Sequence, residues 1–161
     1  MTNHPSVTIA LQILQGLLTP VIAGIAVYIA WQQFKVNKRK LEFDQYERRL
    51  RVYQEVRSIL TLVLRDFKPE FSDLQKFRAA TAEADFLFKP EISTYLDEIV
   101  SRGWKLRSAH AEFRDLTQPP LPGYDHQKVV NAIQEQEKWF TEQLEVGAAK
   151  QKFKKYLDVT R

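Results

Sequence analysis

A run of 25 consecutive residues without a charged side chain, from Val7 to Trp31, constrains the fold of this chain more than any other feature. The run is rich in Leu, Ile, Val and Ala. As a helix rising about 1.5 Å per residue it would extend roughly 37 Å. That length exceeds the ~30 Å hydrocarbon core of a bilayer. The run therefore predicts a transmembrane helix over residues 7–31, preceded by a short extracytoplasmic segment, residues 1–6.

The flanks of this run favour a permanent anchor over a cleaved signal peptide. No basic residue precedes it, it is longer than the apolar part of a signal peptide, and Tyr28 and Trp31 suit a membrane interface. The orientation predicted from the basic residues has the N-terminus outside and the C-terminus in the cytoplasm, which in a bacterium means a single-pass inner-membrane protein. Four basic residues follow the run and are expected to contact anionic lipid head groups: Lys35, Lys38, Arg39 and Lys40.

One side of the predicted transmembrane helix carries small or polar side chains. At 100° per residue these positions fall within one narrow arc. Small residues let two helices approach closely in lipid, and an amide can form a hydrogen bond across their interface. The stripe predicts a homo-oligomer or a partner span; the alternative is that small residues are simply common in membrane helices. Its members are Gln12, Gly16, Thr19, Ala23, Ala26 and Ala30.

The rest of the chain shows the three- and four-residue apolar spacing of amphipathic helices and no credible strand. Because no Pro or Gly occurs between residue 24 and Pro69, the membrane helix is expected to continue into the charged segment. Pro90 suits the first turn of a helix, whereas the Pro-rich stretch 117–124 cannot continue one. The fold class predicted is all-α. A cytoplasmic antiparallel bundle is expected over residues 32–161, with about four helices at 32–67, 70–88, 91–116 and 125–158.

The apolar positions of these segments predict which sides are buried. In the first, the stripe is Phe43, Tyr46, Leu50, Tyr53, Val56, Leu60, Val63 and Phe67. Asp125 is a candidate N-cap for the last segment, which has a possible break at Gly147. We further hypothesise that Arg48 and Arg49 brace the turn between the second and third helices through pairs with Glu91, Asp97 or Glu98.

Nothing in the sequence indicates catalysis or a cofactor. Cysteine is absent, the five glycines are dispersed, and the three histidines lack the spacing of a metal site. His110 lies on the apolar stripe of its segment, which favours a buried, hydrogen-bonded side chain over a ligand. The formal net charge of +4 comes from residues 35–51 and 150–161, whereas 52–149 is net negative. The aromatics of the basic segment fall on its apolar stripe, which argues against nucleic-acid binding.

Three stretches of the cytoplasmic part resemble a pattern found in small bacterial membrane proteins that have one span and a cytoplasmic helical domain. They are Lys40–Val56 (KLEFDQYERRLRVYQEV), Ala84–Val100 (ADFLFKPEISTYLDEIV) and Lys152–Val159 (KFKKYLDV). The resemblance implies a membrane-anchored helical protein and no particular activity.

Two functional hypotheses follow from these patterns. The first is a non-catalytic, membrane-anchored interaction or scaffold module that associates through its span with itself or with a membrane or cytoplasmic partner protein. The alternative is a small oligomeric effector that perturbs or permeabilises the bilayer, with Gln12, Gln15 and Thr19 as its polar groups. No small-molecule substrate is indicated by either hypothesis.

Overall fold

The computed structural model describes residues 5–115, 117 and 122–158, and within these ranges the side chains of residue 16, residue 18 and residues 20 onward. The described residues form helices and turns without a strand, so the predicted all-α class is confirmed. The chain divides into two compact units, residues 1–44 and 45–161. The helix α1 (Pro5–Asp66) contributes to both units and carries Pro20 within it.

The unit 1–44 contains the N-terminal part of α1. Its described side chains are exposed, large apolar ones included. Where side chains are described, no helix is long and apolar enough to cross a membrane. Much of the predicted transmembrane run, at positions 7–15, 17 and 19, has its side chains outside the described part. The transmembrane helix is therefore unsupported by this structure and stays a prediction.

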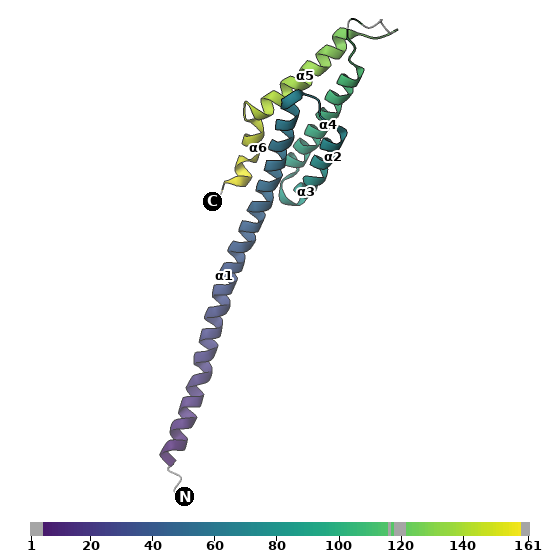
Figure 1. Cartoon of the computed structure of the whole chain (residues 1–161). Helices are drawn as coiled ribbons and strands as arrows, with labels where there is room; N and C mark the ends of the chain where they lie inside the picture. The colour runs from purple at the N-terminus through teal and green to yellow at the C-terminus, as the bar shows by residue number, and fades with distance from the viewer. Residues whose placement is uncertain (1–4, 116, 118–121, 159–161) are drawn as a thin grey trace. The chain divides into compact units, whose positions relative to one another are not determined.

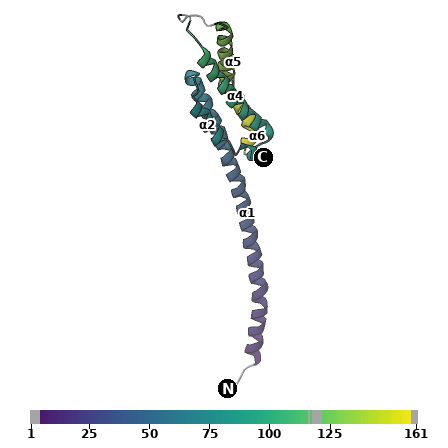
Figure 2. The same ribbon diagram turned by 90° about the vertical axis from the view of Figure 1, so that its right-hand side faces the viewer.

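The unit 45–161 is a helical bundle built from the C-terminal part of α1 and five further helices (Figure 1). The two longest of these, α4 and α5, pack side by side (Figure 2). The five helices are α2 (Phe71–Ala80), α3 (Ala84–Leu87), α4 (Pro90–Glu112), α5 (His126–Leu144) and α6 (Ala148–Leu157).

The core of this unit includes a side chain from each of its helices. From α1 it takes Val52, Val56, Ile59, Leu60 and Val63. The predicted stripe on α1 is correct at Val56, Leu60 and Val63 but omits Val52 and Ile59, and Phe43 is 63% exposed. The largest fully buried side chains from the C-terminal helices are Phe140 of α5 and Phe153 of α6.

The ends of α1 and α4 differ from the predicted boundaries. The last residue of α1 is Asp66, because Phe67 adopts a left-handed conformation with φ 53°. Its amide still donates to the Val63 carbonyl at 2.7 Å. The helix α4 begins at Pro90, as predicted, but stops at Glu112 rather than near residue 116, because Phe113 is extended.

Two predicted helices are each divided in the structure. The segment 70–88 breaks after Ala80, where the Phe77 carbonyl accepts from both the amide and the buried hydroxyl of Thr81, at 3.0 and 2.9 Å. The segment 125–158 breaks at Gly147, the suspected position, whose φ of 77° suits a residue without a Cβ. Asp125 caps α5 as predicted, accepting the Lys128 amide at 3.1 Å.

Candidate docking surface of the helical domain

The predicted association face of the transmembrane run lies only partly within the described residues. Gly16, Ala23, Ala26 and Ala30 are exposed on α1, and no atom outside the helix would meet a Cβ added at Gly16 within 4 Å. The side chains of Gln12 and Thr19 lie outside the described part. Self-association through this face stays a prediction.

The predicted lipid-contacting residues Lys35, Lys38, Arg39 and Lys40 are all exposed on α1. The Lys35 ammonium lies over the Trp31 ring, 3.7 Å from its centroid, and this ring in turn packs against Tyr28 at 6.4 Å. Gln32 donates to the Tyr28 hydroxyl at 3.2 Å. Aromatic and cationic side chains thus gather on one helical segment at the C-terminal end of the apolar run.

Arg48 and Arg49 do brace a helix junction, but the predicted partners are wrong. The Arg49 guanidinium donates from Nε to the Leu87 carbonyl at 3.1 Å, at the end of α3. Arg48 pairs with Glu83 across 3.6 Å. Two of the three carboxylates expected for this role have other partners. Glu91 pairs with Lys155, and Glu98 pairs with Arg102.

Glu91 fastens the start of α4 to α6. Its carboxylate accepts from the Tyr156 hydroxyl at 2.8 Å and forms an ion pair with Lys155. The hydrogen bond from Lys155, followed by that from Tyr156, lowers the pKa of Glu91. The same bond to Glu91 raises the pKa of Lys155. Because Glu91 belongs to α4 and its two partners belong to α6, these contacts hold α6 against the start of α4.

Polar side chains buried between α4 and α5 were missed by the sequence patterns. Gln143 accepts from the Tyr95 hydroxyl at 3.1 Å, and Gln136 accepts from Arg102 at 3.2 Å. Burial raises the pKa of Tyr95, which therefore stays a neutral donor. The Arg102 guanidinium also lies over the Trp139 ring at 4.7 Å. This network packs two helices together and offers no free group to a ligand.

Two of the three histidines, His110 and His126, lie near the connection between α4 and α5, and His4 lies outside the described residues. His110 is half-buried, and its Nε2 atom is buried without a hydrogen-bond partner among the described residues. The expected hydrogen-bonded state is therefore not observed at this atom. The His126 ring packs against Phe113 at 5.5 Å, and its Nδ1 lies 3.3 Å from the Tyr124 hydroxyl.

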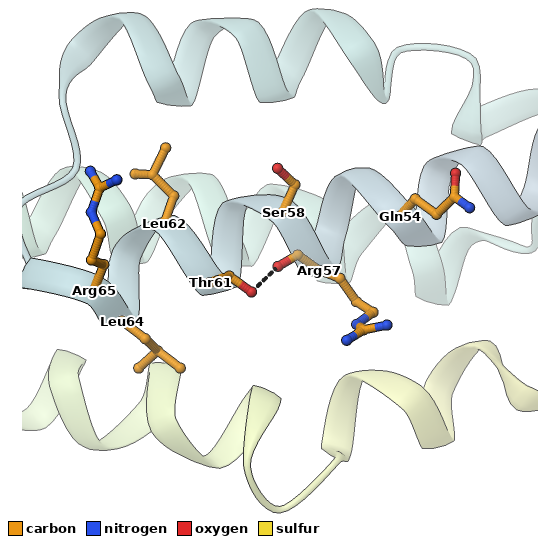
Figure 3. A pocket seen from close by; sticks show the side chains of 7 residues that line it. All are labelled: Gln54, Arg57, Ser58, Thr61, Leu62, Leu64 and Arg65. Atoms are coloured by element: carbon orange, nitrogen blue, oxygen red, sulfur yellow. Dashed lines mark hydrogen bonds between the residues drawn. The ribbon is translucent and has the colours of Figure 1, made fainter.

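The side of α1 that faces away from the core forms an open groove of about 710 Å³ (Figure 3). We call it the outer groove and define it by its seven lining residues, Gln54, Arg57, Ser58, Thr61, Leu62, Leu64 and Arg65. None of the seven is acidic, and all come from α1. In Figure 3 neighbouring helices run along both sides of α1, and the Thr61 hydroxyl donates to the Arg57 carbonyl at 2.8 Å.

Two smaller depressions also involve α1. One lies between α1 and α2, shares Ser58 and Leu62 with the outer groove, and is lined by the acidic residues Glu55 and Asp73 as well as by Lys76. The other, about 340 Å³, lies between α1 and α6 and is lined by Tyr53, Lys150, Lys154, Leu157 and Asp158. Its two lysines add basic groups beside Arg57, which is one helical turn after Tyr53.

Sequence reasoning did not select the outer groove. The signal available was the polar side of α1 opposite its apolar stripe, but such a side is usually only solvated. What marks this side of α1 is the open groove that the structure shows over it.

Comparison with known proteins adds no assignment. No protein family matches the chain, and no characterised protein or solved structure is significantly similar to it.

Proposed function

We propose that this protein is a membrane-anchored, non-catalytic interaction module, with its span in the run 7–31 and its helical unit, residues 45–161, presented to partner proteins. The observation that carries the anchor is the exposure of large apolar side chains around α1. Val21, Ile22, Ile25, Val27 and Ile29 are each between 48% and 70% exposed.

These side chains point in several directions around the helix, since successive residues are rotated by about 100°. A helix that is apolar on all sides is stable only when lipid or protein covers it, because each Å² of exposed apolar surface costs about 25 cal/mol in water. The charge-free sequence of this run, the aromatic residues Tyr28 and Trp31 at its end and Lys35 after it favour lipid.

The interaction role is supported by what the helical unit offers. Its apolar side chains pack into one core, and its polar clusters at Glu91 and Arg102 are internally satisfied. The outer groove of α1 instead presents two guanidinium groups to solvent. A surface of this kind suits recognition of another macromolecule more than chemistry on a substrate.

Membrane extraction of the full chain expressed in bacterial cells tests the anchor. We expect the protein to stay in the membrane pellet through alkaline carbonate washing and to dissolve in detergent. Lysines at two apolar positions, Val21→Lys with Ile25→Lys, should release it, because each buried cation costs about 3 kcal/mol at mid-bilayer. The matched control with leucine at both positions should stay in the pellet.

The orientation is tested by thiol labelling, since the natural chain has no cysteine. A single cysteine introduced by Asn3→Cys should react with an impermeant maleimide in intact spheroplasts. One introduced by Glu145→Cys should react only after lysis. Release of the natural chain by carbonate would refute the anchor, and the reverse labelling pattern would refute the orientation.

A further inference from the structure

We infer that the outer groove of α1 docks an acidic amphipathic helix of a partner protein. This inference rests on the proposed interaction role and names the chemistry of the partner. It depends only on residues of the unit 45–161 and is therefore independent of whether the run 7–31 spans a membrane.

The charge of the groove selects an anionic partner. Arg57 and Arg65 are exposed, and no lining residue carries a negative charge. Arg65 forms an ion pair with its neighbour Asp66 at 3.8 Å, and the Arg65 side chain is still 75% exposed. Guanidinium groups bind carboxylates through paired hydrogen bonds, and Lys150 and Lys154 add positive charge beside Arg57.

The length of the groove suits a helix. Its lining extends from Gln54 to Arg65, which is about 16 Å along the helix axis, or three turns. Neighbouring helices run along both sides of α1 (Figure 3). A partner helix can lie along a surface of this length, as in helix-in-groove recognition.

The positions of the lining residues specify the partner further. Arg57 and Arg65 are eight residues apart, hence about 12 Å along α1. A partner helix lying along the groove would match them with acidic residues seven or eight positions apart. Leu62 and Leu64 point to different sides of α1 (Figure 3). Leu64 packs against the core, and the half-buried Leu62 offers apolar contact. The partner is therefore an amphipathic helix with acidic groups on the docking side and apolar residues next to them.

Fluorescence anisotropy of a labelled peptide tests this inference. The full chain is held in phosphatidylcholine nanodiscs, or is used in buffer if it dissolves without a membrane. The probe is a helical peptide of about 18 residues, with two glutamates spaced like Arg57 and Arg65 and leucines beside them. We expect saturable binding that weakens with salt. The variant Arg57→Glu with Arg65→Glu should bind this peptide at least about tenfold more weakly.

Two controls isolate the groove from general charge. Arg107→Glu with Arg78→Glu makes the same change at exposed arginines of α4 and α2 outside the groove, and it should leave binding within about twofold. A peptide with lysines in place of the glutamates should bind the Arg57→Glu, Arg65→Glu protein better than it binds the natural one. Circular dichroism should show that both variants keep the helical content of the natural chain.

Several results would overturn the inference. One is no peptide binding, and another is binding that is equal in the natural and charge-reversed groove. Self-association of the chain that is lost with Arg57 and Arg65 would make a second copy the occupant. Binding to phosphatidylglycerol vesicles that is lost in the Arg57→Glu, Arg65→Glu variant, without any binding of the peptide, would assign the groove to an anionic membrane. None of these results changes the outcome of the carbonate extraction, so the anchor and the docking surface fail separately.

Discussion

At the scale of single residues, several charged side chains of the helical unit hold helices together. Arg49 is the clearest case, because it ties α1 to the end of α3 by a hydrogen bond to the Leu87 carbonyl. Its guanidinium also lies 6.0 Å from the centre of the Tyr156 ring, in α6. One side chain on α1 thus contacts two other helices.

Replacing Arg49 with alanine is expected to lower the free energy of unfolding by about 1 kcal/mol. A hydrogen bond from a charged donor contributes about 1.5–3 kcal/mol, and partial exposure reduces that figure. Chemical denaturation followed by circular dichroism would measure the change. Arg51→Ala is the matched control, since Arg51 is exposed on the same helix, and it should stay within about 0.5 kcal/mol. Equal effects of the two substitutions would contradict the role assigned to Arg49.

The buried glutamines show where residue patterns are insufficient. Gln136 and Gln143 interrupt the apolar spacing of α5 and look like surface residues in the sequence. They are 4% and 7% exposed because Arg102 and Tyr95 of α4 supply hydrogen bonds to them. Burying an amide is tolerated only when such a partner is present. The partner lies 34 or 48 residues away in the sequence, so the pattern within one helix cannot reveal it.

At the scale of helices, one close crossing fixes α2 against α4. Gly103 of α4 faces the buried Leu74 of α2, and a Cβ added to this glycine would lie 2.6 Å from the Leu74 Cδ2 atom. The importance of this glycine comes from the helix that packs on it.

Gly103→Ala is expected to lower the stability of the natural chain but to raise it when residue 74 is made smaller. In the natural chain the clash should cost about 1–3 kcal/mol and exceed the ~1 kcal/mol that alanine contributes as a better helix former. In a Leu74→Ala background, where the clash is removed, the same substitution should stabilise by up to about 1 kcal/mol. A double-mutant cycle by denaturant unfolding measures this coupling. Additive effects would show that the two side chains do not compete for space.

At the scale of the whole molecule, the two units differ in what stabilises them. Every buried side chain of the apolar core lies between Val52 and Phe153, within the unit 45–161. Among the described residues of the unit 1–44, large apolar groups such as Val27 and Phe34 are exposed instead. The core residues that the structure describes thus all belong to the unit 45–161.

A fragment of residues 45–161 is accordingly expected to fold by itself. It should be helical by circular dichroism and unfold cooperatively, with a midpoint within about 5 °C of that of the same transition in the full chain, a shift equivalent to about 1 kcal/mol. Adding Phe140→Ala to the fragment should lower its stability by about 3–5 kcal/mol, since this side chain is fully buried. A fragment that lacks cooperative unfolding would show that residues 1–44 contribute to the core.

The sequence by itself determined the helical class, several helix ends and most of the buried faces. It could do so because these depend on short-range chemistry: Pro90 at a first turn, Asp125 as a cap, Gly147 in a left-handed conformation, and apolar residues three and four apart. The tertiary structure alone decided the partners of Arg48 and Arg49, the burial of the α5 glutamines and the outer groove at Arg57 and Arg65. Each of these depends on which helices become neighbours, and that is set by packing between segments far apart in the chain.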